Sequence, residues 1–103
     1  MKQKSSKLNK LEKNRYSVFY KDFEACCYCG SIYNITKHEI FEGRNRRNSM
    51  KYGYVLPLCS KCHSQLQNNN DFNIKWKVLS QKHFEEKIGN RDDFIKIFRK
   101  SYF

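Results

Sequence analysis

The sequence lacks a long apolar run, an export signal and an internal linker, and each absence narrows the classes of function. No stretch approaches the roughly 18 apolar residues that cross a bilayer, so we expect no transmembrane role and no membrane partner. The N-terminal sequence MKQKSSKLNK is too polar for the core of a signal peptide, so we expect a reducing compartment. A chain of 103 residues without a repeat is one domain, near the size at which a hydrophobic core alone gives modest stability.

Acidic residues are also scarce. Ten Asp and Glu against 21 Lys and Arg give a net charge of +11, and such a field favours a polyanion, by default a nucleic acid. Aromatic residues make up 16% of the chain, which separates it from a disordered basic tail. Residues 1–21 contain Glu12 as their single acidic side chain, so we interpret them as a basic arm that lies along phosphates and orders on binding. A single domain follows in residues 22–103. The alternative for the arm is a solvated tail that keeps the protein soluble.

The five cysteines include two pairs with the spacing of metal ligands. Cys26 and Cys29 form one Cys-x-x-Cys turn, and Cys59 and Cys62 form another. Each turn places two thiolates on one side of a loop, about 3.5 to 4 Å apart, as tetrahedral Zn²⁺ requires, so we predict a structural zinc site. Disulfides are the alternative, and the odd number of cysteines argues against them. Cys27 is the spare thiol, which we expect to be buried or half-exposed.

The predicted elements are a strand, a loop, a strand and three helices. β-Branched and aromatic residues predict strands over residues 32–41 and 52–58, with a polar loop over residues 42–49. Helices are expected over residues 59–67, over residues 71–88 and after Asn90. Their apolar stripes are expected to form core rather than a base-stacking platform, and comprise Phe72, Trp76, Leu79, Phe84, Ile88, Phe94, Ile97 and Phe98. The fold class is therefore α+β, with zinc joining both ends of the strand-loop-strand-helix unit.

Four motifs occur in a recognisable order along the chain. They are CCYCG at residues 26–30, His38-Glu39-Ile40-Phe41, Gly43-Arg44 with Arg46-Arg47, and PLCSKCH at residues 57–63. As a set they resemble the ββα-metal fold of HNH endonucleases, and more closely a phage- and prophage-type group with a four-cysteine zinc site. The resemblance runs from about Cys26 to the C-terminus. It implies a small zinc-stapled ββα core between the basic arm and C-terminal helices.

The resemblance also implies an activity and site residues. The activity is that of a metal-dependent endonuclease that nicks or cuts DNA, with RNA as the alternative, in the cytoplasm of a bacterial or phage-infected cell. His63 is implied as a ligand of a catalytic divalent ion, while His38 and Glu39 share the roles of base and second ligand. If His38 is the base, Glu39 is a hard oxygen ligand suited to Mg²⁺ or Mn²⁺, with Ni²⁺ or Zn²⁺ as other candidates. If His38 is the ligand, Glu39 is the base. We favour the first assignment, because an imidazole titrates near neutral pH and an ordinary carboxylate is a weak proton acceptor.

Two positions depart from the family's pattern. Tyr54 stands near the position of the family's middle Asn, which leaves Asn45 or Asn48 as substitutes. Gln67 stands where some relatives carry a further histidine. His83 lies in none of the four motifs and is expected to be an ordinary helix residue.

Basic residues of the predicted loop are expected to clamp phosphates beside the catalytic ion, because bidentate guanidinium groups suit that task. They are Arg44, Arg46, Arg47 and Lys51. A solvated face is the alternative. Two other functions fit the sequence: a non-catalytic zinc module that binds DNA or RNA through charge, and a small phage-type protein that acts by binding another protein.

Overall fold

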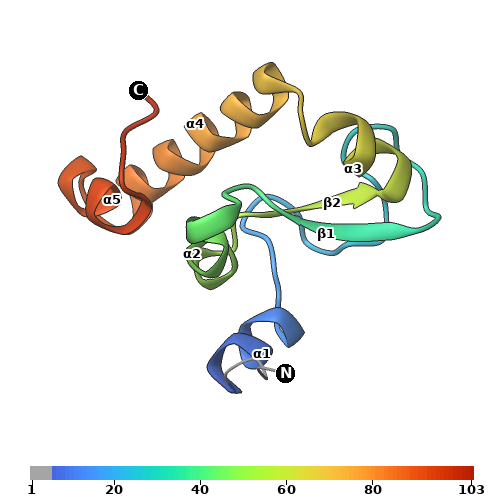
Figure 1. Cartoon of the computed structure of the whole chain (residues 1–103), viewed down its shortest axis with the longest axis horizontal. Coiled ribbons are helices and arrows are strands. Elements are labelled where there is room, and N and C mark those ends of the chain that lie inside the picture. The colour runs from blue at the N-terminus through green and yellow to red at the C-terminus, as the bar shows by residue number, and fades with distance from the viewer. Residues whose placement is uncertain (1–5) are drawn as a thin grey trace.

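Two short antiparallel strands lie at the centre of the fold in the computed structural model, which describes residues 6–103 (Figure 1). Strand β1 (Ile35–Glu39) pairs with β2 (Val55–Cys59), and the register places Thr36 opposite Leu58. The sequence of β2, VLPLC, is apolar throughout, and the strand is buried along its whole length. A small sheet packed among helices confirms the α+β class.

Helices account for most of the remaining structure. Within the described residues they are α1 (Ser6–Lys13), the 3-10 turn η1 (Gly43–Asn45), α2 (Arg46–Tyr52), α3 (Ser60–Leu66), α4 (Asn70–Lys87) and α5 (Arg91–Phe98). Helix α3 follows β2 directly, α4 runs above the sheet, and α5 lies at the end of the molecule opposite α3 (Figure 1). The three helices predicted after the second strand are therefore confirmed. No helix within residues 6–103 is long and apolar enough to cross a membrane.

The polar loop predicted over residues 42–49 is wrong in its second half, where α2 begins at Arg46. The buried Ser49 anchors this helix to the segments that flank the sheet, because its hydroxyl accepts a hydrogen bond from the Phe41 N–H and donates one to the Tyr54 carbonyl. Gly53 ends α2 at φ 75°, in the left-handed region that favours glycine. The second strand consequently begins at Val55 rather than at residue 52.

The main hydrophobic core lies between the sheet, α4 and α5. Its buried members are Ile40, Phe41, Tyr54, Leu56, Phe84, Phe94 and Phe98. The prediction that the apolar stripes of the C-terminal helices form core is confirmed for Phe84, Phe94 and Phe98. Ile88 is an exception, since it caps the C-terminal end of α4 and is 47% exposed. Helix α5 begins with a capping box between Asn90 and Asp93, which fixes where α5 starts.

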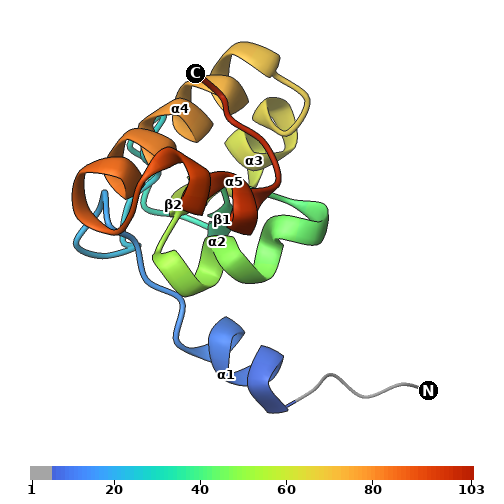
Figure 2. The ribbon, with the colours of Figure 1, turned by 90° about the vertical axis from the view of Figure 1, so that its left-hand side faces the viewer.

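The N-terminal segment forms a helix that lies apart from the sheet (Figure 2). Helix α1 occupies part of the predicted basic arm, whose residues 1–5 lie outside the described residues. Glu12 at the end of α1 pairs with Arg46 of α2, with Oε1 and Nη1 3.1 Å apart. The arm therefore has a contact with the rest of the chain close to β1. Its role along phosphates, and the division into arm and domain, stay predictions.

Candidate metal centres

Four cysteine side chains meet where the loop before β1 approaches the junction of β2 and α3. The sulfur atoms of Cys26, Cys29, Cys59 and Cys62 all lie within 4.8 Å of one another. Cys29 Sγ and Cys59 Sγ, from different turns, are 3.7 Å apart. The predicted cluster is confirmed to this extent: four cysteines are positioned to bind a metal ion, in an arrangement consistent with structural zinc.

Local backbone geometry forms the two cysteine turns. Gly30 has φ 81°, and its N–H donates to the Cys26 carbonyl at 2.9 Å, which closes the first turn. Cys59 caps α3, because its sulfur accepts a hydrogen bond from the Cys62 N–H at 3.4 Å. Cys27 is half-buried, as expected, and its N–H donates to the Pro57 carbonyl at 2.8 Å. This bond ties the first turn to β2.

The thiols differ in how readily they ionise. Burial raises the pKa of Cys62, and hydrogen bonds with the neighbouring thiols raise it further. Burial also acts to raise the pKa of Cys26, but hydrogen bonds from the backbone of Cys29, Cys59 and Tyr28 outweigh burial and lower the value to about 6. Four thiolates this close repel one another, so a bound divalent cation is what allows all four to be ligands.

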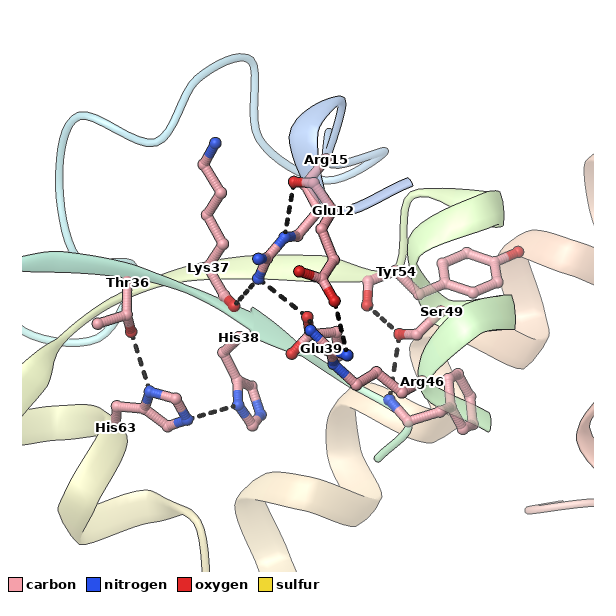
Figure 3. Close-up of polar contacts among 11 residues, drawn as sticks. Glu12, Arg15, Thr36, Lys37, His38, Glu39, Arg46, Ser49, Tyr54 and His63 are labelled. Carbon is pink, nitrogen blue, oxygen red and sulfur yellow. Dashed lines mark hydrogen bonds and ion pairs between the residues drawn. The ribbon is translucent and has the colours of Figure 1, made fainter. Parts of the chain in front are cut away.

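Two histidines meet on the side of β1 that faces α3. Nδ1 of His38, from β1, lies 3.3 Å from Nε2 of His63, from α3 (Figure 3). The rings meet edge to face, with centroids 4.9 Å apart and an interplanar angle of 70°. Both side chains thus present a nitrogen to the same point, and we call them the histidine pair.

The environment of His38 favours its neutral form. Burial lowers the pKa of His38 to about 4, and the nearby His63 lowers it as well. The carboxylates of Glu39 and Glu42 act in the opposite direction without cancelling these effects. A neutral imidazole is the form that binds a metal ion or accepts a proton.

Thr36 contacts the other side of the His63 ring. Thr36 Oγ1 lies 3.0 Å from His63 Nδ1 and donates a hydrogen bond to the Leu58 carbonyl at 2.7 Å. Leu58 is the partner of Thr36 in the strand register. The orientation of the His63 ring is therefore fixed from the sheet.

Glu39 follows His38 directly but has different partners. Its Oε1 accepts a hydrogen bond from Arg15 Nη1 at 2.9 Å and lies 3.3 Å from Arg46 Nε (Figure 3). Arg15 also donates to the Lys37 carbonyl at 3.2 Å. Among the described residues, no third Cys, Asp, Glu or His joins the histidine pair in a group that could hold a metal ion. The structure thus brings His38 and His63 together, whereas Glu39 forms ion pairs with two arginines.

A cleft of about 370 Å³ opens over the histidine pair. Its other lining residues are Glu39, Glu42, Gln67, Asn68 and Asn73. Glu42 is exposed and pairs with Lys77 of α4, with Oε1 and Nζ 3.0 Å apart. The side-chain oxygens around this cleft are hard donors, which suit a divalent ion such as Mg²⁺.

The basic residues predicted to clamp phosphates flank two neighbouring cavities. One, of about 480 Å³, is lined by Gly43, Arg44, Arg46, Arg47 and Asn48. The other, of about 570 Å³, lies between α1 and α2 and is lined by Lys10, Leu11, Asn14, Tyr16, Arg47, Asn48, Met50 and Lys51. All four predicted residues line at least one of these cavities. Their role as nucleic-acid contacts stays a prediction.

The residues considered in place of the family's middle Asn have other partners. Asn45 and Asn48 donate their side-chain amides to the carbonyls of Phe98 and Ile97, which end α5, each at 3.1 Å. Tyr54 is fully buried in the core, and its hydroxyl lies 3.1 Å from His83 Nδ1. These contacts stabilise the packing of α2, α4 and α5.

Sequence reasoning did not single out Thr36 or the role of Arg15 beside Glu39. A signal for Thr36 was present, because residues two apart on a strand share a face, and Thr36 precedes His38 by two. Arg15 carried no comparable signal, since its contact depends on where α1 lies. Glu42 could have been noticed as a second carboxylate close to His38 in the sequence.

Comparison of the chain with protein-family models, with curated proteins and with solved structures found no match.

Proposed function

We propose that the protein is a metal-dependent nuclease of the HNH type that hydrolyses phosphodiester bonds of DNA. The observation that supports it best is the histidine pair in a cleft beside the four-cysteine cluster. His38 comes from β1 and His63 from α3, in the strand-strand-helix order that the sequence resemblance implies. RNA is the alternative substrate.

The spacing of the histidine pair suits two ligands of one ion. Two imidazole nitrogens bound tetrahedrally to one Zn²⁺ ion, each at about 2.0–2.1 Å, lie about 3.3 Å apart. His38 Nδ1 and His63 Nε2 are 3.3 Å apart. This match favours His38 as a ligand, and Glu39 as the base, over the reverse assignment favoured from sequence. Mg²⁺ or Mn²⁺ is the proposed ion, with Ni²⁺ or Zn²⁺ as alternatives that imidazole also suits.

The proposed roles of the protein's residues follow from these contacts. His38 and His63 hold the ion, which when bound supplies positive charge to the phosphate and the leaving 3′ oxygen. Arg15 and Arg46, now paired with Glu39, are placed to turn toward an incoming phosphate, since guanidinium groups bind phosphate as well as carboxylate. Their departure leaves the Glu39 carboxylate free to take a proton from water. The four-cysteine cluster holds Zn²⁺ and stabilises the junction of β2 and α3.

A cleavage assay with matched histidine variants tests the proposal. Wild-type protein should nick or cut plasmid or single-stranded DNA with Mg²⁺ or Mn²⁺ and lose this activity when the added ion is omitted. His63→Ala should lower the rate by about 10²-fold or more, by analogy with the removal of one catalytic group. His83→Asn is the control, because His83 lies outside the histidine pair and Asn can still face the Tyr54 hydroxyl. Wild-type protein that cleaves no DNA or RNA with Mg²⁺, Mn²⁺, Ni²⁺ or Zn²⁺ would refute the nuclease proposal.

A zinc-containing module that binds nucleic acid without cleaving it is the second candidate. One observation that favours it is that the Glu39 carboxylate is paired with Arg15 and Arg46. Another is that the side chains of Asn45 and Asn48 are hydrogen-bonded to carbonyls at the end of α5. Such a module would bind DNA or RNA with a steep salt dependence and show no ion-dependent cleavage. The same assay, run beside a binding titration, separates the two candidates.

A further inference from the structure

The hydroxyl of Thr36 lies between two partners, and only one of them can receive its proton. Thr36 Oγ1 is 2.7 Å from the carbonyl oxygen of Leu58. It is also 3.0 Å from Nδ1 of His63 (Figure 3). A carbonyl oxygen can only accept a hydrogen bond, so the single hydroxyl proton goes to Leu58. The opposite arrangement would leave lone pairs of two oxygens facing each other at this short distance. Nδ1 of His63 is therefore the donor to Thr36 Oγ1.

This hydrogen bond decides which nitrogen of His63 has a lone pair. A neutral imidazole carries one proton, so a proton on Nδ1 leaves the lone pair on Nε2. Nε2 is the atom that lies 3.3 Å from His38 Nδ1. Between two neutral imidazoles either ring can be the donor, and Thr36 sets the direction in the ion-free protein: Nδ1 of His38 donates and Nε2 of His63 accepts. An ion held by both rings would replace this hydrogen bond, with the His38 proton carried on its Nε2 instead. The lone pair of His63 thus points to the place where the histidine pair would share an ion.

The fold keeps Thr36 in this position. The strand register pairs Thr36 with Leu58, and Thr36 shares a face of β1 with His38 because the two are two residues apart. A β-branched side chain is also stiff at χ1, so the hydroxyl keeps one direction. Serine could make the same hydrogen bonds, whereas valine would keep the shape and remove them.

We propose that Thr36 is a positioning residue that holds His63 in the Nδ1–H tautomer and so presents the Nε2 lone pair to a divalent ion. The inference rests on the proposed metal site at the histidine pair. A partner on the second ring nitrogen is common for metal-binding histidines, and its removal typically costs about 10- to 100-fold in metal affinity. Thr36 acts through His63 and does not itself contact the ion.

The tautomer can be measured directly by long-range ¹H–¹⁵N correlation NMR of the histidine side chains. The sample is the full chain with zinc in the cysteine cluster and no other divalent ion. His63 should be the Nδ1–H form in the wild type and in Thr36→Ser, and should lose that preference in Thr36→Val. Zinc content and thermal unfolding establish that each variant is folded. An Nε2–H form of His63 in the wild type would overturn the proposal without any variant being needed.

Binding of Mn²⁺, followed by electron paramagnetic resonance of the free ion, tests the consequence. Thr36→Val should bind Mn²⁺ about 10- to 100-fold more weakly than the wild type, and Thr36→Ser should restore most of the affinity. Equal affinities of the wild type and Thr36→Val would overturn the proposal. A wild-type protein with the Nδ1–H tautomer that binds no Mn²⁺ would instead overturn the proposed metal site, while the effect of Thr36 on the tautomer would stand.

Discussion

Glu39 and Arg15 form an ion pair that joins β1 to the segment after α1, with Oε1 and Nη1 2.9 Å apart. The residue next to the histidine pair is therefore held by the same N-terminal region that was expected to lie along phosphates. A phosphate placed near Arg15 would compete with the Glu39 carboxylate for the guanidinium group. The proposed binding of a nucleic acid would therefore compete with the ion pair of Glu39.

Removal of residues 1–13 should weaken DNA binding and make its salt dependence less steep. The deletion removes five lysines and Glu12, a net loss of four positive charges, so fewer counterions are released on binding. The slope of log affinity against log salt concentration should become shallower by up to about 4. Fluorescence anisotropy over a salt series measures the slope, and circular dichroism checks the fold. An unchanged slope would mean that the segment is a solvated tail.

Replacement of a clustered cysteine should remove the metal and much of the stability. Cys59→Ser should lower the zinc content from about one ion per chain to near zero and abolish cooperative unfolding, because metal binding contributes about 10–16 kcal/mol in small zinc domains. Cys27→Ser is the matched control, since this thiol lies beside the cluster but outside it. Elemental analysis and thermal denaturation measure both effects. Full zinc content in Cys59→Ser would contradict the four-cysteine site.

Acid should destabilise the protein through His38. Burial lowers its pKa to about 4, and the neighbouring His63 and Lys77 also lower it, while Glu39 and Glu42 oppose them. Between pH 4 and the ordinary value of 6.5 the unfolded chain binds more protons at this residue than the folded chain. Stability therefore rises with pH across this window and is lost as the pH falls through it, by up to about 3 kcal/mol from this group.

The contribution of His38 is isolated by comparison with His38→Gln. Urea denaturation of both proteins at a series of pH values gives the difference in unfolding free energy. Protonation of the cysteine cluster affects both proteins alike and cancels in this difference. A difference that stays constant between pH 7 and pH 4 would contradict the buried, neutral state of His38.

The sequence was sufficient for the cysteine cluster and the C-terminal helices because their signals are local. Two Cys-x-x-Cys turns specify their own geometry, and the apolar spacing of Phe84, Phe94 and Phe98 specifies which faces are buried. Helix α2 was missed because RRNSMKY has little apolar periodicity. It is anchored by Ser49, whose hydrogen bonds to Phe41 and Tyr54 depend on tertiary structure.

The candidate site was predictable in its residues but not in its contacts. His38 and His63 were chosen from the sequence, and the structure places their rings side by side. The partners of Glu39 could not be predicted, because Arg15 reaches it from the segment after α1, whose position no local pattern encodes. The proposed tautomer of His63 could not be predicted from the sequence either, because it depends on the register of β1 and β2.

Glu39→Gln distinguishes the two assignments of base and ligand. If Glu39 is the base, the amide cannot accept the proton, so cleavage should fall by about 10²- to 10⁴-fold at every Mn²⁺ concentration. If Glu39 is a ligand, the rate should be recovered at high Mn²⁺, because the weaker amide ligand raises the concentration required. His38→Ala gives the complementary result: recovery at high Mn²⁺ identifies a ligand, and a uniform loss identifies the base. The spacing of the histidine pair predicts a uniform loss for Glu39→Gln and a shifted Mn²⁺ dependence for His38→Ala. The reverse pattern would restore His38 as the base, and DNA binding measured without Mn²⁺ should be retained in both variants.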